Sequence, residues 1–339
     1  MQRHTLALFV AVGVLLAFSP MALAQYQLKN LDSNQFRKAV HDDPLMVNAW
    51  GLARGATSPW WVANQGSGWS TLYDRTGAKQ GLVVAVPPSA SGFVGQPTGV
   101  VFNGTTDFQV QGWQSFFVFD TLDGTISAWS PQVNLKSAIV MVDNSKSGAV
   151  YTALAITNKA AGNLLFAVNN AANQVEIYDT TFTNKGTFAA DPGVPAGMAA
   201  FGIRDINGVV FVSFAPTNGG PGGYIDMYKE DGTLMRTFAQ GAPLNQPWGF
   251  AVAPKNFGAL SNTLLISNNN NAGTIVGYDA KGNFVGVLKD ASGNPIVINQ
   301  LWAIDFGGGN STNGDANQLF FTAGPDNNLA GTFGSIVAK

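Results

Sequence analysis

The chain has 339 residues, a formal net charge of −2 and no cysteine. The lack of cysteine excludes disulfides and thiol chemistry, and the lack of any run of four like charges argues against nucleic acid as a partner. Only 11% of the residues are charged, whereas 40 are glycine. Because Gly, Asn and Asp favour turns over helices, this composition predicts many short strands joined by tight turns.

Residues 1–24 have the features of a secretory signal peptide. Arg3 gives a basic start, residues 6–18 form an apolar run, and an Ala-Leu-Ala cleavage motif ends at Ala24. The apolar run is too short to span a bilayer, and no later run reaches that length. We therefore expect cleavage after Ala24, export to the periplasm or the medium, and no membrane span. An uncleaved anchor is the alternative.

Residues 25–31 alternate apolar and polar side chains, which predicts a strand. A disordered leader is the alternative. The segment HDDP follows at residues 41–44 and contains the only histidine after the signal peptide. His41 and Asp43 are therefore candidate general bases over a channel mouth. The alternative is a solvated loop in which Asp43 sets up the turn before Pro44.

Two markers then recur about every fifty residues, in the manner of a repeat protein. The first marker opens a short apolar strand, and its copies begin at Trp50, Thr98, Thr152, Ala196, Trp248 and Trp302. The second is an aromatic residue that ends a strand, and its copies are Tyr73, Trp129, Tyr178, Tyr228 and Tyr278. One strand lies between the markers and another follows the second marker. Four antiparallel strands per repeat are typical of a β-propeller blade.

The sequence therefore predicts an all-β, six-bladed β-propeller, with four antiparallel strands per blade, as a single domain over residues 25–339. The predicted blades are residues 48–95, 96–148, 149–194, 195–244, 245–297 and 298–339. The sixth repeat ends after its third strand, at residues 332–337. We expect residues 25–31 to supply the missing fourth strand and so close the ring without a disulfide.

Polar side chains recur where the second strands end. Alignment on the second marker gives the positions Asn64, Asp120, Asn169 and Asn269, with Gly219 in the fourth blade. A ring of carboxylate and amide oxygens at a channel mouth would suit Ca²⁺ or another divalent cation, so these four residues are candidate metal ligands. Ordinary turn chemistry is the alternative, because Asn and Asp also bond to the backbone at strand ends.

Four further residues are candidate ligand-binding positions. Asn48 and Asn327 belong to loops of the same predicted face, while Trp69 and Trp113 lie in loop contexts where a ring can stack on a sugar or an aromatic ligand. Packing between blades is the alternative for both tryptophans. The glycine runs at 219–223 and 307–309 lack the Lys-Ser/Thr or helix of a phosphate loop, so we expect no nucleotide cofactor.

The segments DPLMVNAWGLA, PWWVANQGSGWSTLYDRTG and QLFFTAGPDNNLAGTFGSI resemble a family of exported bacterial propellers of unknown function, which is frequent in genomes with the PEP-CTERM sorting system. The resemblance covers the mature chain and implies export and six blades. The Pro-Glu-Pro motif and apolar tail of the sorted members are missing, so we do not expect surface anchoring by that route.

A looser similarity connects the chain with NHL-repeat propellers and with the gluconolactonase and regucalcin group, and it implies metal dependence. The glutamate of that group's ligand set has no counterpart here. Glu176 is predicted in mid-strand and Glu230 in an outer turn.

We therefore expect an exported, soluble, monomeric propeller that binds a ligand or protein of the cell envelope or the medium through its Asn/Asp-rich face. The alternative is a metal-assisted hydrolase or lyase that acts on a lactone, ester or uronide at the same face. A purely structural role is a third possibility.

Overall fold

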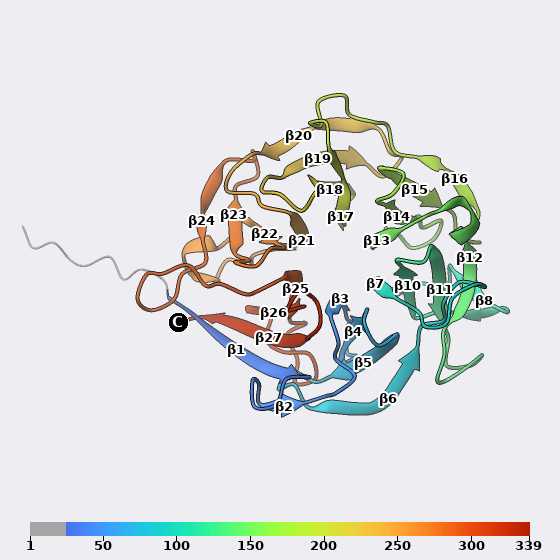
Figure 1. The fold of residues 1–339 in the computed structure, drawn as a ribbon, viewed down its shortest axis with the longest axis horizontal. Coiled ribbons are helices and arrows are strands. Elements are labelled where there is room, and N and C mark those ends of the chain that lie inside the picture. The colour runs from blue at the N-terminus through green and yellow to red at the C-terminus, as the bar shows by residue number, and fades with distance from the viewer. Residues whose placement is uncertain (1–24) are drawn as a thin grey trace, which may run out of the picture.

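The computed structural model describes residues 25–339, and the predicted signal peptide at 1–24 lies outside the described residues. Six sheets surround a central axis, with their first strands innermost (Figure 1). The predicted all-β, six-bladed propeller is confirmed. Within residues 25–339, no helix is long and apolar enough to cross a membrane.

Each blade is an antiparallel sheet whose first strand lies at the centre and whose fourth strand lies at the rim. Blade one contains β3 (Ala49–Ala53), β4 (Trp60–Asn64), β5 (Trp69–Tyr73) and β6 (Lys79–Ala85). Blade two contains β7 (Pro97–Phe102), β10 (Phe117–Thr121), β11 (Thr125–Trp129) and β12 (Ile139–Asp143). Blade three contains β13 (Tyr151–Ile156), β14 (Leu165–Asn169), β15 (Gln174–Tyr178) and β16 (Asn184–Thr187).

The second half of the chain repeats this arrangement. Blade four contains β17 (Met198–Ile206), β18 (Val209–Pro216), β19 (Tyr224–Lys229) and β20 (Leu234–Gln240). Blade five contains β21 (Pro247–Val252), β22 (Leu264–Asn268), β23 (Ile275–Tyr278) and β24 (Phe284–Val287). Three short elements lie outside the blades: the hairpin of β8 (Gln109–Val110) and β9 (Trp113–Gln114), η1 (Ser145–Ser147) and η2 (Gly258–Leu260).

The sixth blade joins the two ends of the chain. Its strands run from β25 (Leu301–Phe306) through β26 (Gln318–Ala323) and β27 (Thr332–Ala338) to β1 (Tyr26–Ser33) and β2 (His41–Asp42). β1 pairs antiparallel with β27, beginning with Tyr26 opposite Ala338, which confirms the predicted closing strand. The Tyr26 hydroxyl also donates to the Phe257 carbonyl at 2.8 Å, so β1 contacts blade five as well.

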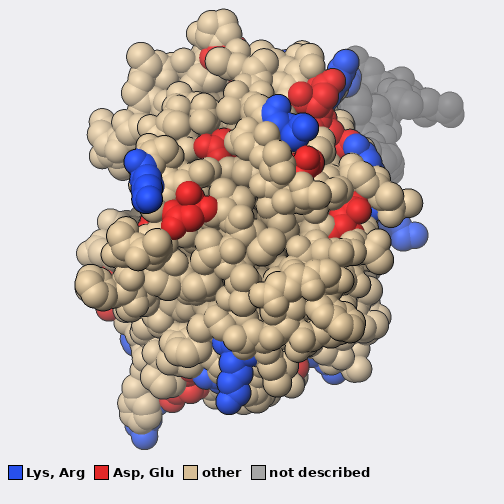
Figure 2. All heavy atoms as spheres, turned by 90° about the vertical axis from the view of Figure 1, so that its right-hand side faces the viewer, with Lys and Arg blue, Asp and Glu red and all other residues tan. Residues whose placement is uncertain are grey.

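Aromatic side chains pack between neighbouring blades and form much of the core. Trp61 of blade one stacks on Phe117 of blade two with ring centroids 4.0 Å apart, and Phe211 of blade four packs against Phe250 of blade five at 6.2 Å. Charged side chains are sparse on the side of the molecule seen in Figure 2, where both signs are intermixed. The ring is therefore held by apolar contacts between its sheets.

The repeated Trp-Gly sequence marks a β-bulge in the inner strand. In blade five the ladder skips from Pro247 to Phe250, and the bulged Gly249 amide donates to the Ser267 hydroxyl at 2.8 Å. That hydroxyl donates in turn to the Trp302 carbonyl of blade six at 2.6 Å. Hydroxyls at Ser213 and Thr322 make the same bridge from blades four and six. One side chain therefore satisfies the bulge and ties its blade to the next.

The bulge also corrects the position of the first marker in blade four. The sequence marker was placed at Ala196, but the glycine that bonds Ser213 is Gly202, inside β17. β17 is nine residues long, longer than the other inner strands, so Phe201 and Gly202 are the counterparts of Trp248 and Gly249.

A side chain at Gly202 should destabilise the ring. A Cβ there would lie 2.1 Å from the Trp248 carbonyl oxygen of the next blade, which is backbone and cannot move aside. We expect Gly202→Ala to lower the free energy of unfolding by about 1–3 kcal/mol in a denaturant titration. Gly81→Ala is the matched control, because nothing lies within 4 Å of its Cβ position. Equal effects of the two variants would contradict the close approach of the inner strands.

Candidate functional site

A chamber lies at the centre of the ring and opens where the inner strands end. We call the face of the ring at which the inner strands end the exit face. We call the opposite face, at which they begin, the entry face. The chamber has a volume of about 380 Å³. One apolar side chain from each inner strand lines it: Leu52, Val100, Leu154, Ile203, Phe250 and Ile304. Each comes directly after the glycine or alanine at the bulge, so the bulges place these six side chains at one level.

Three buried tryptophans lie on the entry-face side of the chamber. Trp50 stacks on Trp302 with ring centroids 3.5 Å apart, and Trp248 meets both edge-on. The Trp248 indole of blade five donates to the Thr152 carbonyl of blade three at 3.1 Å, so its ring reaches across the axis. Trp248 also lines the chamber. The Trp248 indole thus forms the chamber's floor, with the other two indoles packed against it, and a ligand would enter from the exit face.

Charged side chains at the ends of three inner strands also line the chamber. They are Arg54 after β3, Arg204 and Asp205 in β17, and Asp305 in β25. Arg204 donates to the Asp305 carboxylate at 3.0 Å, which links blade four to blade six across blade five. A second hollow of about 450 Å³ shares Arg204, Asp205 and Asp305 with the chamber and extends it towards Glu230.

Arg54 is a cation of the chamber that makes no ion pair within residues 25–339. Its Nε donates to the Phe306 carbonyl at 2.9 Å, and its guanidinium lies 5.5 Å from the Trp60 ring centre. Within residues 25–339, its two terminal nitrogens make no hydrogen bond. Burial lowers the pKa of Arg54, the Asp305 charge raises it, and the Arg204 charge lowers it further. A partly desolvated cation with unused donors is suited to bind an anion.

The predictions from the sequence did not include these charged residues, although their positions in the inner strands are a detectable signal. The inner strands read AWGLAR, FGIRD and WAIDF, so a charge ends a run of apolar and small residues in three of them. A charge in a strand that is buried on both faces is expensive unless it is paired or functional.

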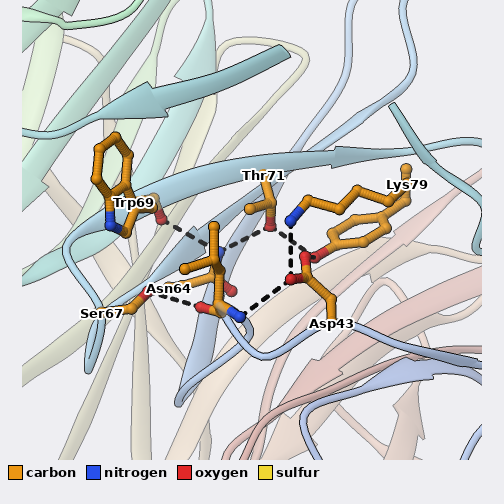
Figure 3. Close-up of polar contacts among 8 residues, drawn as sticks. Asp43, Asn64, Ser67, Trp69, Thr71 and Lys79 are labelled. Atoms are coloured by element: carbon orange, nitrogen blue, oxygen red, sulfur yellow. Dashed lines mark hydrogen bonds and ion pairs between the residues drawn. The ribbon is translucent and has the colours of Figure 1, made fainter. Parts of the chain in front are cut away.

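The four candidate metal ligands lie at the ends of second strands, each in a different blade, and are buried. Asn64 donates to the Trp69 carbonyl at 3.1 Å and the Thr71 hydroxyl at 2.8 Å, as Figure 3 shows. Asp120 accepts from the Gly99 amide at 2.5 Å and the Thr98 hydroxyl at 2.8 Å.

The remaining two candidate ligands also bond to groups of the blades. Asn169 donates to Glu176 at 2.8 Å, and Asn269 donates to the Leu301 carbonyl at 3.1 Å. Among residues 25–339, no hydrogen bond joins any two of the four candidates. One oxygen each of Asn64 and Asp120 is buried without a partner. Binding of Ca²⁺ at these residues stays a prediction.

The predicted equivalence of the four positions is wrong. Asn64 and Asn169 pair with the residue before the bulge, whereas Asp120 lies opposite the bulge and Asn269 follows the end of β22. The loops between second and third strands differ in length, so an alignment counted back from the aromatic marker slips by one residue. A slip of one residue turns a strand side chain to the other face.

His41 and Asp43 do not lie over the channel mouth as predicted. His41 belongs to β2, the outermost strand of blade six, which pairs in parallel with β1. Asp43 is buried between the closing strand and blade one, where it accepts from Lys79 at 2.8 Å and from the Tyr73 hydroxyl at 2.6 Å (Figure 3). Both positions favour a structural role for the two residues.

The four candidate ligand-binding residues do not form one surface. Asn48 is buried and accepts from the Trp302 indole at 2.9 Å, so it orients an indole packed against the floor of the chamber. Asn327 is exposed in the loop between β26 and β27. Trp69 begins β5 on the entry face, whereas Trp113 is 55% exposed in the hairpin that follows β7 on the exit face. Ligand binding at each stays a prediction.

Comparison with known proteins gives relatives without an assigned activity. No protein-family model matches the chain. An uncharacterized protein of Acanthamoeba polyphaga mimivirus is 27% identical over 334 residues, which cover 93% of this chain and 81% of that protein. A second uncharacterized mimivirus protein is 33% identical over 205 residues, covering 56% of this chain and 38% of the relative.

Solved structures share the architecture at low identity. A streptogramin B lyase has a TM-score of 0.56 and 9% identity, covering 93% of this chain and 98% of its own. A gluconolactonase from Xanthomonas campestris has a TM-score of 0.56 and 13% sequence identity, and the match covers 86% of each chain. The calcium-binding protein regucalcin from Agrobacterium tumefaciens has a TM-score of 0.54 and 11% sequence identity, and the match covers 86% of this chain and 91% of its own. At these identities the likeness shows the fold alone, and the chain is a six-bladed propeller with uncharacterized viral homologues.

Proposed function

We propose that the protein is a ligand-binding propeller that takes a small molecule with an oxyanion group, a carboxylate or a phosphate, into the exit-face chamber. The observation that carries this proposal is Arg54, a half-buried guanidinium in the chamber wall with two terminal nitrogens unbonded in residues 25–339. A planar guanidinium binds carboxylate and phosphate through two parallel hydrogen bonds.

The rest of the chamber fits such a ligand. Its volume of about 380 Å³ is within the range of small-molecule sites, and its wall combines apolar side chains with polar groups that can orient a ligand. Arg204 already bonds to Asp305, so that pair contributes little net charge to the chamber. The body of the ligand would lie against the six apolar side chains while its anionic end meets Arg54.

We further propose that the protein acts outside the cytoplasm, in the periplasm or the medium, after removal of residues 1–24. The support is the leader sequence and the resemblance to exported bacterial propellers. A monomer that binds an envelope or extracellular compound is consistent with this location.

Replacing Arg54 should weaken ligand binding more than it changes the fold. We expect benzoate, gluconate or inorganic phosphate to change the tryptophan fluorescence of the wild type, because Trp248 lines the chamber. For a probe that binds, Arg54→Gln should raise the Kd by roughly 10–100-fold, the loss expected for a charged hydrogen-bonded pair. Arg54→Lys should recover only part of the affinity, since it keeps the charge but loses the planar fork.

Arg75→Gln is the matched control, because Arg75 is exposed and lies outside the chamber. It should bind each probe as tightly as the wild type does. The proposal fails if no probe changes the fluorescence of the wild type, or if Arg54→Gln and Arg75→Gln bind equally well.

A metal-assisted hydrolase or lyase at the entry face is the second candidate. The unpartnered buried oxygens of Asn64 and Asp120 favour it, because an oxygen that accepts no hydrogen bond can still face a cation. The hydrogen bonds that tie the four predicted ligands into separate blades count against it.

A further inference from the structure

Buried acids in two neighbouring blades occupy matching positions but have different surroundings. Glu176 in β15 and Asp226 in β19 each lie two residues before the aromatic marker. Glu176 accepts hydrogen bonds from four side chains: Tyr151 at 2.7 Å, Tyr178 at 2.5 Å, Asn169 at 2.8 Å and Gln174 at 3.4 Å. Its charge is therefore well compensated.

Asp226 lacks that compensation. It is fully buried, with an exposed fraction of 0%, and only hydroxyls stabilise its charge: Tyr228, through a long hydrogen bond of 3.4 Å, and Thr237. Its Oδ1 has no partner. The Asp191 carboxylate lies close enough for its charge to act on Asp226. An orphaned buried carboxylate oxygen points to a missing positive partner.

A second carboxylate and a cavity lie beside Asp226. Asp191, in the connection from β16 to β17, lines a cavity of about 190 Å³ together with Tyr228, which shares a face of β19 with Asp226. The Tyr224 hydroxyl lies 3.0 Å from Asp191 and 2.6 Å from the Thr237 hydroxyl. Two carboxylates and two hydroxyls from blade four and its entry loop thus meet at the boundary with blade three.

No basic side chain neutralises this pair. Among residues 25–339, no ion pair involves Asp191 or Asp226. The contrast is Asp43 in blade one, where Lys79 supplies the positive charge at 2.8 Å. Two like charges that share a buried site need a proton or a cation between them.

We propose that Asp191 and Asp226 bind a hard divalent cation of the Ca²⁺ class at the boundary of blades three and four. Carboxylate oxygens are the ligands such ions prefer, and two of them balance the charge. The hydroxyls of Tyr224 and Thr237 are placed to add oxygen contacts, and the cavity beside Asp191 gives an ion access from solvent. This site is separate from the exit-face chamber and does not depend on the function proposed for it.

Terbium luminescence tests this site directly. Tb³⁺ takes the same oxygen ligands as Ca²⁺, and Tyr224 and Tyr228 lie close enough to the carboxylates to transfer excitation. We expect the wild type to show saturable, tyrosine-sensitised emission with about one ion per chain, displaced by Ca²⁺. Asp226→Asn and Asp191→Asn should each weaken the apparent affinity by at least about tenfold, since each removes one of two charged ligands.

Asp120→Asn is the control for the site and also tests the metal ligands predicted from the sequence. It should keep the emission of the wild type. Thermal melts establish that each variant is folded. Asp191→Asn is the variant least expected to disturb folding, because Asp191 lies in a loop. Absence of saturable emission, unchanged affinity in both folded Asp191 and Asp226 variants, or loss of emission in Asp120→Asn alone would overturn the proposal.

Discussion

Deletion of residues 25–31 should cost the protein most of its stability. The deletion removes most of β1, the rim strand that pairs with β27, together with the buried Tyr26 and Leu31 side chains. Burial of two such side chains contributes about 4–6 kcal/mol, and the exposed edge of β27 adds to the loss. Because a typical domain is stable by only about 5–15 kcal/mol, we expect partial or complete unfolding at 25 °C, measured by circular dichroism and thermal melts.

A circular permutant separates the closing contact from the position of the strand in the chain. The Lys339 amide donates to the Gln25 carbonyl at 2.8 Å, so a short linker can join these ends. New termini between Ala291 and Ser292 would lie in an exposed turn. We expect this permutant to melt close to the wild type. A deletion variant as stable as the wild type would contradict closure by β1.

The second large effect concerns Asp120 and pH. Asp120 is fully buried, and burial raises its pKa to about 7 despite the hydrogen bonds from Thr98 and Gly99. The pKa of an unfolded aspartate is about 3.9, so the native state favours the protonated form. The resulting stability is complete below about pH 4 and is lost as pH rises through about 7. We expect Asp120→Asn to exceed the wild type by about 3–4 kcal/mol at pH 8 and to match it near pH 4.

Urea titrations of both proteins from pH 4 to 8 measure this difference. Asp315→Asn is the control, because Asp315 is exposed and makes no side-chain hydrogen bond within residues 25–339. Asp32 and Asp226 also have pKa values raised to about 7, mainly by burial, so the wild type should lose stability with rising pH even apart from Asp120. A difference between wild type and Asp120→Asn that stays constant across this range would contradict a buried, proton-binding Asp120.

The number of blades and the closure of the ring were predictable because they depend on periodic signals. The Trp-Gly marker corresponds to a bulge where inner strands approach closely, and only a small residue fits opposite the next blade's backbone. The alternation holds in β1 from Tyr26 to Asn30 and breaks at a register shift before Asp32, where Leu31 is also buried. Such signals repeat in every blade, so an error in one copy does not change the fold.

Prediction of the site residues required the register of the strands. Amino-acid composition and the two repeated sequence markers do not determine that register. Asp120 and Asn269 were assigned to one ring, yet the ladder places them at different positions around the bulge. His41 was misplaced because β2 pairs in parallel with β1 after an irregular loop, a contact with no local sequence signal. Arg54 and Asp305 are far apart in the sequence, and only the convergence of six strand ends brings them to one chamber.

The measurement that tests the account most directly is a crystal structure grown with whichever of benzoate, gluconate or phosphate changes the tryptophan fluorescence most. We predict density for the oxyanion against the Arg54 guanidinium, inside the exit-face chamber and above the Trp248 floor. Density instead at the entry face, near Asn48 and Asn64, or a chamber that stays empty at saturating probe, would contradict the proposed site.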